Sequence, residues 1–266
     1  MMNHYSVTQL ASTVADALGC ERPLQASGPL PPVRNYLEQT LGGKADRVLV
    51  YNPDCMGQWF WQKYTEKYLP VMKAAPLAVP LSTVMPSVTP VCFGSMYTGA
   101  MPAVHGIRTY AKPVITIDSL FDSAVRSGKK VALAAVQDSS MARIFMNRPI
   151  DYYIEKYDGE VTERALRLIE EDRYDLLVVY NQEYDDLIHE TAIESPEALA
   201  AAFRHIDTFE KLTDAVRENW KDHNVMTVFA PDHGNHMDWN GHGNHGEFRE
   251  DDINIIHFFG ACPKAR

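Results

Sequence analysis

The stretch that says most about the fold is Val225-Met226-Thr227-Val228-Phe229-Ala230-Pro231-Asp232-His233-Gly234. Its first six residues are nearly all apolar, which is typical of a short strand buried on both faces of a parallel sheet. An acid, a histidine and a glycine follow soon after. A much earlier stretch has the same form, because the apolar run 48–51 leads to Asp54. The sequence therefore predicts two strands that present acids at their carboxyl ends.

Short apolar runs alternate with helical patterns through most of the chain. The predicted strands are Arg47–Tyr51, Lys130–Val136, Asp175–Tyr180, Val225–Ala230 and Ile253–Phe259. The predicted helices are one capped by Asp118 that ends near Gly128, Glu160–Glu171, and a long one that starts at Ser195-Pro196. This alternation predicts an α/β fold, a three-layer sandwich with a mostly parallel central sheet. Sites in such sheets form beyond the carboxyl ends of the strands.

The first 45 residues have a different character. Apolar residues at helical spacing predict a helix over 7–18, with Ser6 as its N-cap and Gly19 as its stop. A Pro- and Gly-rich loop, 22–32, separates it from a second predicted helix, Val33–Leu41. We expect a single domain, 1–266, with 1–45 as a helical N-terminal arm that packs on the surface or makes an oligomer contact.

Composition limits the classes of protein that fit. The chain has 266 residues and a formal net charge of −10, which disfavours binding of nucleic-acid polymers. No run approaches the ~20 apolar residues of a membrane span, and no signal-peptide pattern opens the sequence. The four cysteines show neither disulfide nor zinc-knuckle spacing: Cys20, Cys55, Cys92 and Cys262. We therefore expect a reduced, cytoplasmic protein.

Three aspartates and three histidines are candidate metal ligands: Asp54, Asp185, His189, Asp232, His233 and His245. Carboxylate and imidazole ligands of this kind suit two divalent ions, zinc most of all and manganese second. Asp185 and His189 are spaced i, i+4, which places both on one side of a helical turn, although they could be an ordinary polar face. Asp186 could replace Asp185, and His242 is a rival of His245.

Thr89 is the candidate nucleophile. It precedes Pro90, which suits the start of a helix whose N–H groups would face an incoming phosphoryl oxygen. A free hydroxyl is almost never ionised at neutral pH, so it needs a base or a metal ion. Thr89 could instead be only an N-cap, and Ser87 is the competing hydroxyl.

These pieces, in this order, resemble the alkaline phosphatase superfamily, and within it the nucleotide pyrophosphatase/phosphodiesterase branch. The resemblance rests on 86–107, which holds a proline, Thr89, Thr98-Gly99 and His105-Gly106-Ile107 without gaps. It also rests on Asp185-x-x-x-His189, Asp232-His233-Gly234 and His245-Gly246. It extends from about Arg47 to Gly260.

The resemblance implies how the candidate residues act. One ion would take Asp185, His189 and His245. The other would take Asp54, Asp232, His233 and the Thr89 oxygen. Thr89 would form a covalent phospho-threonine, which water then hydrolyses. The family has an asparagine about twenty residues past the nucleophile, where this chain has Tyr110. Tyr110 and Arg108 are therefore the candidate substrate-binding residues, with Lys112 as a further donor.

We expect a metal-dependent phosphohydrolase that cleaves a phosphodiester or a nucleotide-type pyrophosphate in a small substrate. Alternatives on the same site are a phosphomonoesterase and a phosphotransferase or mutase. A catalytically silent binding domain is a further alternative. A sulfatase fits poorly, because that branch needs a modified Cys or Ser followed by x-Pro-x-Arg.

Overall fold

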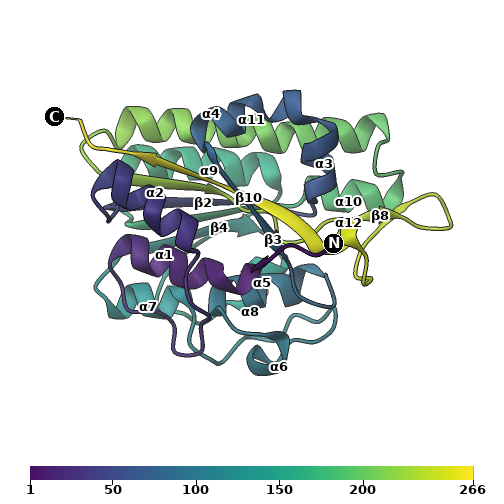
Figure 1. Cartoon of the computed structure of the whole chain (residues 1–266), viewed down its shortest axis with the longest axis horizontal. Coiled ribbons are helices and arrows are strands. Elements are labelled where there is room, and N and C mark those ends of the chain that lie inside the picture. Colours follow the sequence, from purple (N-terminus) through teal and green to yellow (C-terminus); the bar gives the residue numbers. More distant parts are fainter. Residues whose placement is uncertain (266) are drawn as a thin grey trace.

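The computed structural model describes residues 1–265, which form three layers with an eight-stranded sheet in the middle (Figure 1). The strands lie in the order β1-β3-β10-β7-β2-β6-β4-β5. All neighbouring strands pair in parallel except β10, which is antiparallel to both of its neighbours. The predicted three-layer fold is thus confirmed. The strands are β1 Tyr5–Ser6, β2 Arg47–Pro53, β3 Leu77–Ser82, β4 Val131–Val136, β5 Asp151–Glu155, β6 Leu176–Asn181, β7 Val225–Phe229 and β10 Asn254–Cys262.

Helices cover both faces of this sheet, and each face has its own apolar core. The upper layer in Figure 1 holds α3 Gln58–Lys63, η2 Thr65–Tyr68, α4 Leu69–Ala74, α9 Asp158–Glu171, α10 Glu183–Glu190 and α11 Pro196–Asn219. The other face is covered by η1 Val7–Gln9, α1 Leu10–Leu18, α2 Pro31–Leu41, α5 Thr89–Thr98, α6 Pro102–His105, α7 Leu120–Arg126 and α8 Ser140–Ile144. Near the C-terminus are the short elements β8 His236–Met237, β9 Gly243–Asn244 and α12 Glu250–Ile253.

The central strands read as continuous apolar runs because both of their faces are buried. Along β2, Val48 and Val50 join one core, while Leu49 and Tyr51 join the other. Successive side chains of a strand point to opposite faces, so a strand between two helix layers needs an apolar residue at every position. The same holds for β4, β6 and β7, whose residues are all buried.

Three strands of the sheet and one helix cap differ from the sequence predictions. The strands β1, β3 and β5 were not predicted, because all three are partly exposed and lack a continuous apolar run. The helix α7 is capped by Ser119 and not by Asp118, since Ser119 forms a capping box with Asp122. Asp118 instead accepts hydrogen bonds from Arg126. The predicted N-cap Ser6 and helix stop at Gly19 are confirmed.

The N-terminal segment 1–45 packs into the body of the molecule. Its strand β1 pairs with β3, and most of α1 is buried in the core of the lower layer. The Ser27 N–H donates to the carbonyl of Gly99 at the end of α5, at 2.8 Å. A Cβ on Gly99 would lie only 2.4 Å from the Ala26 Cβ, so glycine is needed for this close approach. The segment thus supports the helix that begins with Thr89.

No helix within residues 1–265 is long and apolar enough to cross a membrane. All four cysteines are free thiols, and Cys262 alone among them is exposed.

Candidate active site

The candidate ligands meet at the carboxyl ends of three adjacent strands. Asp54 directly follows β2, Asp232 comes shortly after β7, and α10 begins two residues after β6. Because β2 lies between β7 and β6, these three strand ends are neighbours. This is the edge at which parallel α/β sheets form their sites. His245 arrives from farther along the chain, in the loop after β9.

The first cluster consists of Asp54, Asp232 and His233, all buried. The His233 Nε2 atom lies 3.4 Å from Asp54 Oδ1 and 3.4 Å from Asp232 Oδ2. The Thr89 hydroxyl oxygen lies 3.3 Å from the same His233 nitrogen. Three ligand atoms and the candidate nucleophile thus surround one small space.

The second cluster consists of Asp185, His189 and His245. Asp185 Oδ1 lies 3.5 Å from His189 Nε2 and 3.3 Å from His245 Nε2. The two histidine nitrogens are 3.1 Å apart. The His189 side chain is 43% exposed, so this cluster opens to solvent at that residue. The rings of His233 and His245 stack with centroids 4.1 Å apart and join the two clusters.

Hydrogen bonds orient two of the histidines toward the clusters. The Nδ1 atom of His245 lies 2.9 Å from the carbonyl oxygen of Ser87, and that of His233 lies 3.0 Å from the carbonyl oxygen of Gly234. A carbonyl only accepts, so each Nδ1 carries the proton and donates. Each Nε2 is therefore left with a lone pair that faces the acids. Metal-binding histidines are held in this way by partners behind them.

The carboxylates of Asp54 and Asp232 are held on one side only. Asp54 Oδ2 accepts the hydroxyl proton of Tyr180, and Asp232 Oδ1 accepts the Cys55 N–H at 3.2 Å. Their other oxygens, and Asp185 Oδ1, are buried without a hydrogen-bond partner within residues 1–265. A buried carboxylate oxygen without a partner is costly. Divalent cations would satisfy all three, so these residues fit a pair of metal ions.

Without cations, the first cluster favours protonated acids. Burial raises the pKa of Asp54 well above its ordinary value, and the charges of Asp232 and Asp185 raise it further. Burial also raises the pKa of Asp232 to about 7 and lowers that of His233 to about 3. Burial acts in the same direction on Asp185, but His245 and His189 outweigh it and lower its pKa. Cation binding would therefore displace protons from Asp54 and Asp232.

Thr89 is the first residue of α5, and Val88 is the N-cap. Thr89 is therefore not the N-cap of this helix, and the alternative that its hydroxyl serves only as a cap is wrong. All ten residues of α5 are buried. The Tyr97 hydroxyl donates to Asn52 Oδ1 at 2.6 Å, and the Asn52 amide donates to the carbonyl of Ala230 at 2.7 Å. This chain of contacts ties α5 to the strand ends that carry the acids.

A cleft of about 180 Å³ opens onto Asp54, Thr89 and Asp185. The remaining residues that line it are Tyr110, Lys112, Gln137, Asp138, Ser139, Ser140, Tyr180, Gln182 and Asp186. Tyr110, a candidate substrate-binding residue, is thus beside the clusters. Arg108, the other candidate, does not line this cleft, and its guanidinium donates to the carbonyl of Ala103 at 3.3 Å.

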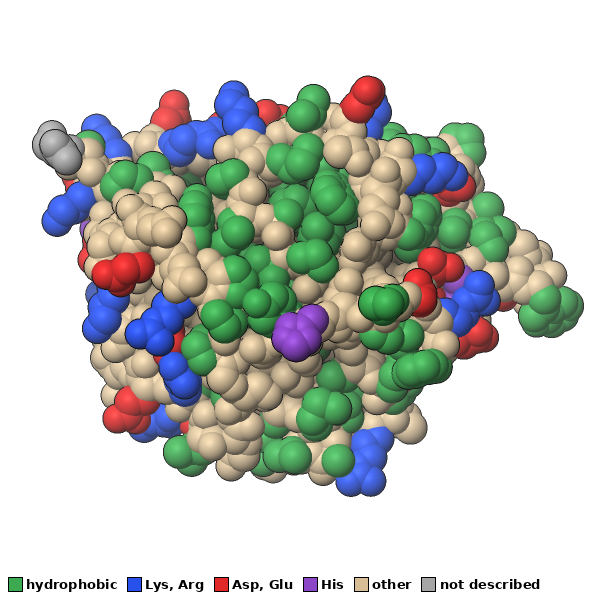
Figure 2. All heavy atoms as spheres, in the orientation of Figure 1, with side chains coloured by type: hydrophobic (Ala, Val, Ile, Leu, Met, Phe, Trp, Pro, Cys, Tyr) green, Lys and Arg blue, Asp and Glu red, His purple; other side chains and the backbone are tan. Residues whose placement is uncertain are grey.

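The structure separates the rival ligands by position. Asp186 points to other partners, because it accepts hydrogen bonds from Tyr157 at 2.8 Å and Gln182 at 3.1 Å. His242 is exposed in the loop between β8 and β9. That loop projects from the body with hydrophobic atoms at its end (Figure 2), and its Trp239 is 93% exposed. The structure therefore brings Asp185 and His245, and not their rivals, to the clusters.

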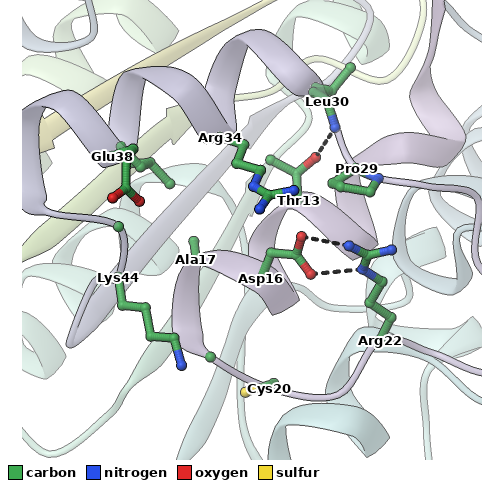
Figure 3. A pocket seen from close by; sticks show the side chains of 13 residues that line it. Thr13, Asp16, Ala17, Cys20, Arg22, Pro29, Leu30, Arg34, Glu38 and Lys44 are labelled. Atoms are coloured by element: carbon green, nitrogen blue, oxygen red, sulfur yellow. Dashed lines mark hydrogen bonds and ion pairs between the residues drawn. The ribbon is translucent and has the colours of Figure 1, made fainter.

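A second hollow, of about 370 Å³, is lined by residues of α1, α2 and the segments next to them (Figure 3), and none of the candidate site residues lines it. Asp16 and Arg22 form a two-point ion pair there, at 2.7 and 2.8 Å. The Thr13 hydroxyl accepts the Leu30 N–H at 2.9 Å. These contacts tie the helices α1 and α2 to the loop between them, which accounts for this hollow as a feature of packing.

Three contacts of the site have no signal in the sequence. They are the Tyr180 hydroxyl on Asp54, the Ser87 carbonyl behind His245, and the Cys55 side chain near the second cluster. Tyr180 was predicted only as the end of a strand, and Cys55 only as a reduced thiol. The position of Cys55 directly after Asp54 was the one available hint.

No protein-family model matches the sequence, and no curated protein matches it. Solved structures do resemble the chain in shape. Phosphonoacetate hydrolase from Sinorhizobium meliloti, in complex with phosphonoformate, has a TM-score of 0.51 at 16% identity, over 74% of this chain and 59% of that one. Murine ectonucleotide pyrophosphatase/phosphodiesterase 5, as an inactive threonine-to-alanine variant with AMP, has a TM-score of 0.56 at 15% identity, over 72% and 58%.

The 2-O GAG sulfatase BT1596 has a TM-score of 0.61 at 14% identity, over 82% of this chain and 64% of that one. The three proteins are hydrolases of the alkaline phosphatase superfamily. The chain has the fold of that superfamily, as its motifs predicted. It spans less than two thirds of the length of each of these three proteins.

Proposed function

We propose that the protein is a two-metal phosphohydrolase that cleaves phosphodiesters or nucleotide-type pyrophosphates through a phosphorylated Thr89. One observation carries this proposal. The hydroxyl of Thr89 lies 3.3 Å from His233, beside two clusters in which three buried carboxylate oxygens lack hydrogen-bond partners within the described residues. Carboxylate oxygens that lack hydrogen-bond partners can bind cations, and the amino terminus of α5 beside them can bind a phosphoryl group.

Two ions would be held, one by Asp185, His189 and His245, and the other by Asp54, Asp232 and His233. Zinc suits this mixture of nitrogen and oxygen ligands best. When bound, the ions supply positive charge that stabilises the phosphoryl oxygens and the ionised form of a nearby hydroxyl.

The chain's own groups divide the reaction into two displacements. In the first, Thr89 Oγ1 loses its proton to solvent and forms a bond to phosphorus. The bond to the leaving oxygen breaks with its electron pair, and that oxygen takes a proton from solvent. In the second, water attacks phosphorus from the side opposite Thr89 and loses a proton to solvent. The bond from phosphorus to Thr89 Oγ1 breaks with its electron pair, Oγ1 regains a proton from solvent, and the phosphate product departs. The buried helix α5, tied to Asn52 through Tyr97, holds the threonine in position throughout.

The lining of the cleft favours a diester. A phosphate monoester dianion carries one more negative charge than a diester, so it gains more from a basic side chain that faces the metals. Lys112 is the one basic side chain among the described residues that line the cleft, and its ammonium donates to the carbonyl of Asp138 at 2.9 Å. Asp138 and Asp186 add negative charge to the same walls. The inactive threonine-to-alanine variant of the murine phosphodiesterase, with bound AMP, supports both the threonine and a nucleotide-type substrate.

Kinetic comparison of an aryl phosphodiester with the matching monoester, on protein of measured metal content, tests the proposal. We expect roughly two divalent ions per chain and a higher kcat/KM for the diester. A tenfold preference for the monoester, about 1.4 kcal/mol in transition-state energy, would identify a phosphomonoesterase instead. A retained phospho-enzyme that passes its phosphate to an added alcohol would identify a phosphotransferase. Protein without metal whose activity ignores chelators would overturn the two-metal proposal itself.

A further inference from the structure

Cys55 lies beside the second cluster, although neither the motifs nor the proposed function uses it. Its Sγ atom, an Asp185 carboxylate oxygen and ring nitrogens of His233 and His245 all lie within 4.8 Å of one another. The side chain is completely buried. Its backbone has φ +67°, a region that residues other than glycine rarely adopt. The turn that directs Asp54 into the first cluster thus places the next side chain near the second.

The Cys55 side chain belongs to the apolar core of the upper layer, and its sulfur also has two polar contacts. The Asn235 amide donates to Sγ at 3.4 Å and to the Cys55 carbonyl at 2.7 Å. The one acceptor for the thiol proton within the described residues is the Gly234 carbonyl, at 3.6 Å. A buried cysteine that acts only as a small apolar residue needs no donor on its sulfur. The Asn235 amide would also donate to a sulfur that is bound to a metal ion.

An independent observation points to a cation at the same place. Asp185 Oδ1 is buried and has no hydrogen-bond partner within residues 1–265. It lies 3.3 Å from His245 Nε2, which matches the separation of about 3.3 Å between two ligand atoms in a tetrahedral zinc site with bonds of about 2.0 Å. His233 Nε2 lies 3.4 Å from both Asp54 and Asp232, so His233 belongs to the first cluster.

We propose that Cys55 Sγ is a ligand of the metal ion held by Asp185, His189 and His245. This inference rests on the two-metal site of the proposed function. On binding, the thiol proton leaves to solvent and the sulfur shares an electron pair with the ion. Soft thiolate ligands select zinc, whereas manganese prefers carboxylate, carbonyl and water. The consequence is selectivity: Cys55 makes this position a zinc site and disfavours manganese.

Cobalt(II) in place of zinc provides a direct spectroscopic test. The exposed Cys262 could bind cobalt by itself, so all proteins carry Cys262→Ser. With otherwise native sequence, we expect visible bands of bound cobalt and a near-ultraviolet sulfur-to-cobalt charge-transfer band. Cys55→Ser should lose the charge-transfer band and keep the visible bands. Cys20→Ser, which removes another buried thiol, beside Ser127, should keep both.

The outcomes separate this inference from the proposed function. Visible bands without a charge-transfer band, or a charge-transfer band that survives Cys55→Ser, would overturn the Cys55 assignment alone. Absence of all cobalt bands would overturn both proposals, since no metal site would then exist.

A second variant guards against misfolding of Cys55→Ser. Cys55→Gly removes the sulfur and suits the backbone, because glycine adopts φ near +67° without strain. Each protein is equilibrated with equal zinc and manganese, and the bound metals are measured. We expect Cys55→Gly and Cys55→Ser to lower the bound zinc-to-manganese ratio at least tenfold, and Cys20→Ser to leave it unchanged. An unchanged ratio in the folded Cys55→Gly protein would overturn the proposal.

Discussion

Acidic residues at the two ends of the central sheet differ in whether their carboxylate oxygens have partners. At the amino end, Arg47 donates to Asp172 at 3.0 Å and to Asp175 at 2.6 Å. His223 adds a contact of 2.8 Å to the second oxygen of Asp172. At the carboxyl end, Asp54 and Asp232 each keep one buried oxygen without a partner.

The pKa values follow this difference. Partial burial acts to raise the pKa of Asp172, but hydrogen bonds from His223 and Arg47 outweigh it and lower the pKa. No basic side chain offsets burial at Asp54, whose pKa is raised well above its ordinary value. Acids at the amino end are thus paired with basic side chains of the chain, whereas Asp54 and Asp232 at the candidate site have no positively charged partner within the described residues. A set of unsatisfied acids in an otherwise satisfied protein indicates a binding site.

The largest expected effect is at the carboxyl end, where Thr89→Ala should lower turnover by about 10³-fold or more. The change removes the nucleophile but leaves the six side chains of the two clusters in place, so metal content should stay near that of the native protein. Turnover and metal content are measured together on the same samples.

Thr89→Ser is the matched control, because it keeps a hydroxyl and should retain more activity than Thr89→Ala. Near-normal turnover of Thr89→Ala would instead point to Ser87 or to direct attack by water.

A smaller effect is expected when single ligands are removed. His245→Ala should weaken binding of one ion by at least about tenfold, since His245 Nε2 lies 3.3 Å from Asp185. His242→Ala should leave binding unchanged, because His242 is exposed in the adjacent loop. Titration of the metal-free proteins with zinc measures both. Equal losses in the two variants would show that the loop moves on metal binding and that His242 shares the role.

Ionisation of Asp232 should destabilise the metal-free protein as pH rises from about 4 to about 7. The folded pKa of Asp232 is about 7, whereas an unfolded aspartate has a pKa of about 3.9. The folded state thus binds this proton more tightly, and the stabilisation present below about pH 4 is lost as pH rises to about 7. We expect a loss of about 1–3 kcal/mol, a magnitude limited by coupling to Asp54.

Chemical denaturation of native and Asp232→Asn proteins in chelator, from pH 4 to 8, isolates this contribution. The stability difference between the two should change across that range and level off above pH 7. If the difference stays constant, Asp232 is already ionised in the metal-free fold. Added zinc should reverse the trend of the native protein, because cations compete with protons for the carboxylate.

The smallest expected effect is at the amino end. Asp172→Asn should destabilise the protein by about 0.5–1.5 kcal/mol at pH 7, since the side chain is 32% exposed and solvent screens its ion pairs. Activity should not change.

Asp54→Asn is the matching change at the carboxyl end. In the metal-free protein it should leave the free energy of unfolding unchanged or raise it, because it removes a buried acid beside two others. Destabilisation by both changes would remove the contrast between the two ends of the sheet.

The sequence predicted the elements that burial on two faces makes distinctive. The strands β2, β4, β6 and β7 were found because each contains a continuous, largely apolar run that is buried. The strands β1, β3 and β5 were missed, since β1 has only two residues, β3 has alternating exposed residues and β5 carries acids at both ends. The N-terminal segment gave no sign of how closely it packs, because its contacts are with residues far along the chain.

The candidate site divides in a similar way. Its six candidate ligands and the candidate nucleophile Thr89 were predicted because they occur in ordered motifs, and the structure places these side chains close together. The contacts of Tyr180 and Cys55 depend on how separate strand ends meet, which no spacing in the sequence records. Arg108 was predicted to bind substrate but does not line the cleft, because its position depends on the path of an irregular loop.

Strand β10 occupies a place that affects how the chain can assemble during synthesis. It is made after every other strand of this sheet, yet it lies between β3 and β7. The edge formed by β1 and β3 therefore cannot join the rest of the sheet until residues 254–262 have been made. Throughout that time β3 presents unpaired backbone groups to other chains. Pro80, in the middle of β3, lacks an N–H donor and makes the waiting strand a poorer template for association.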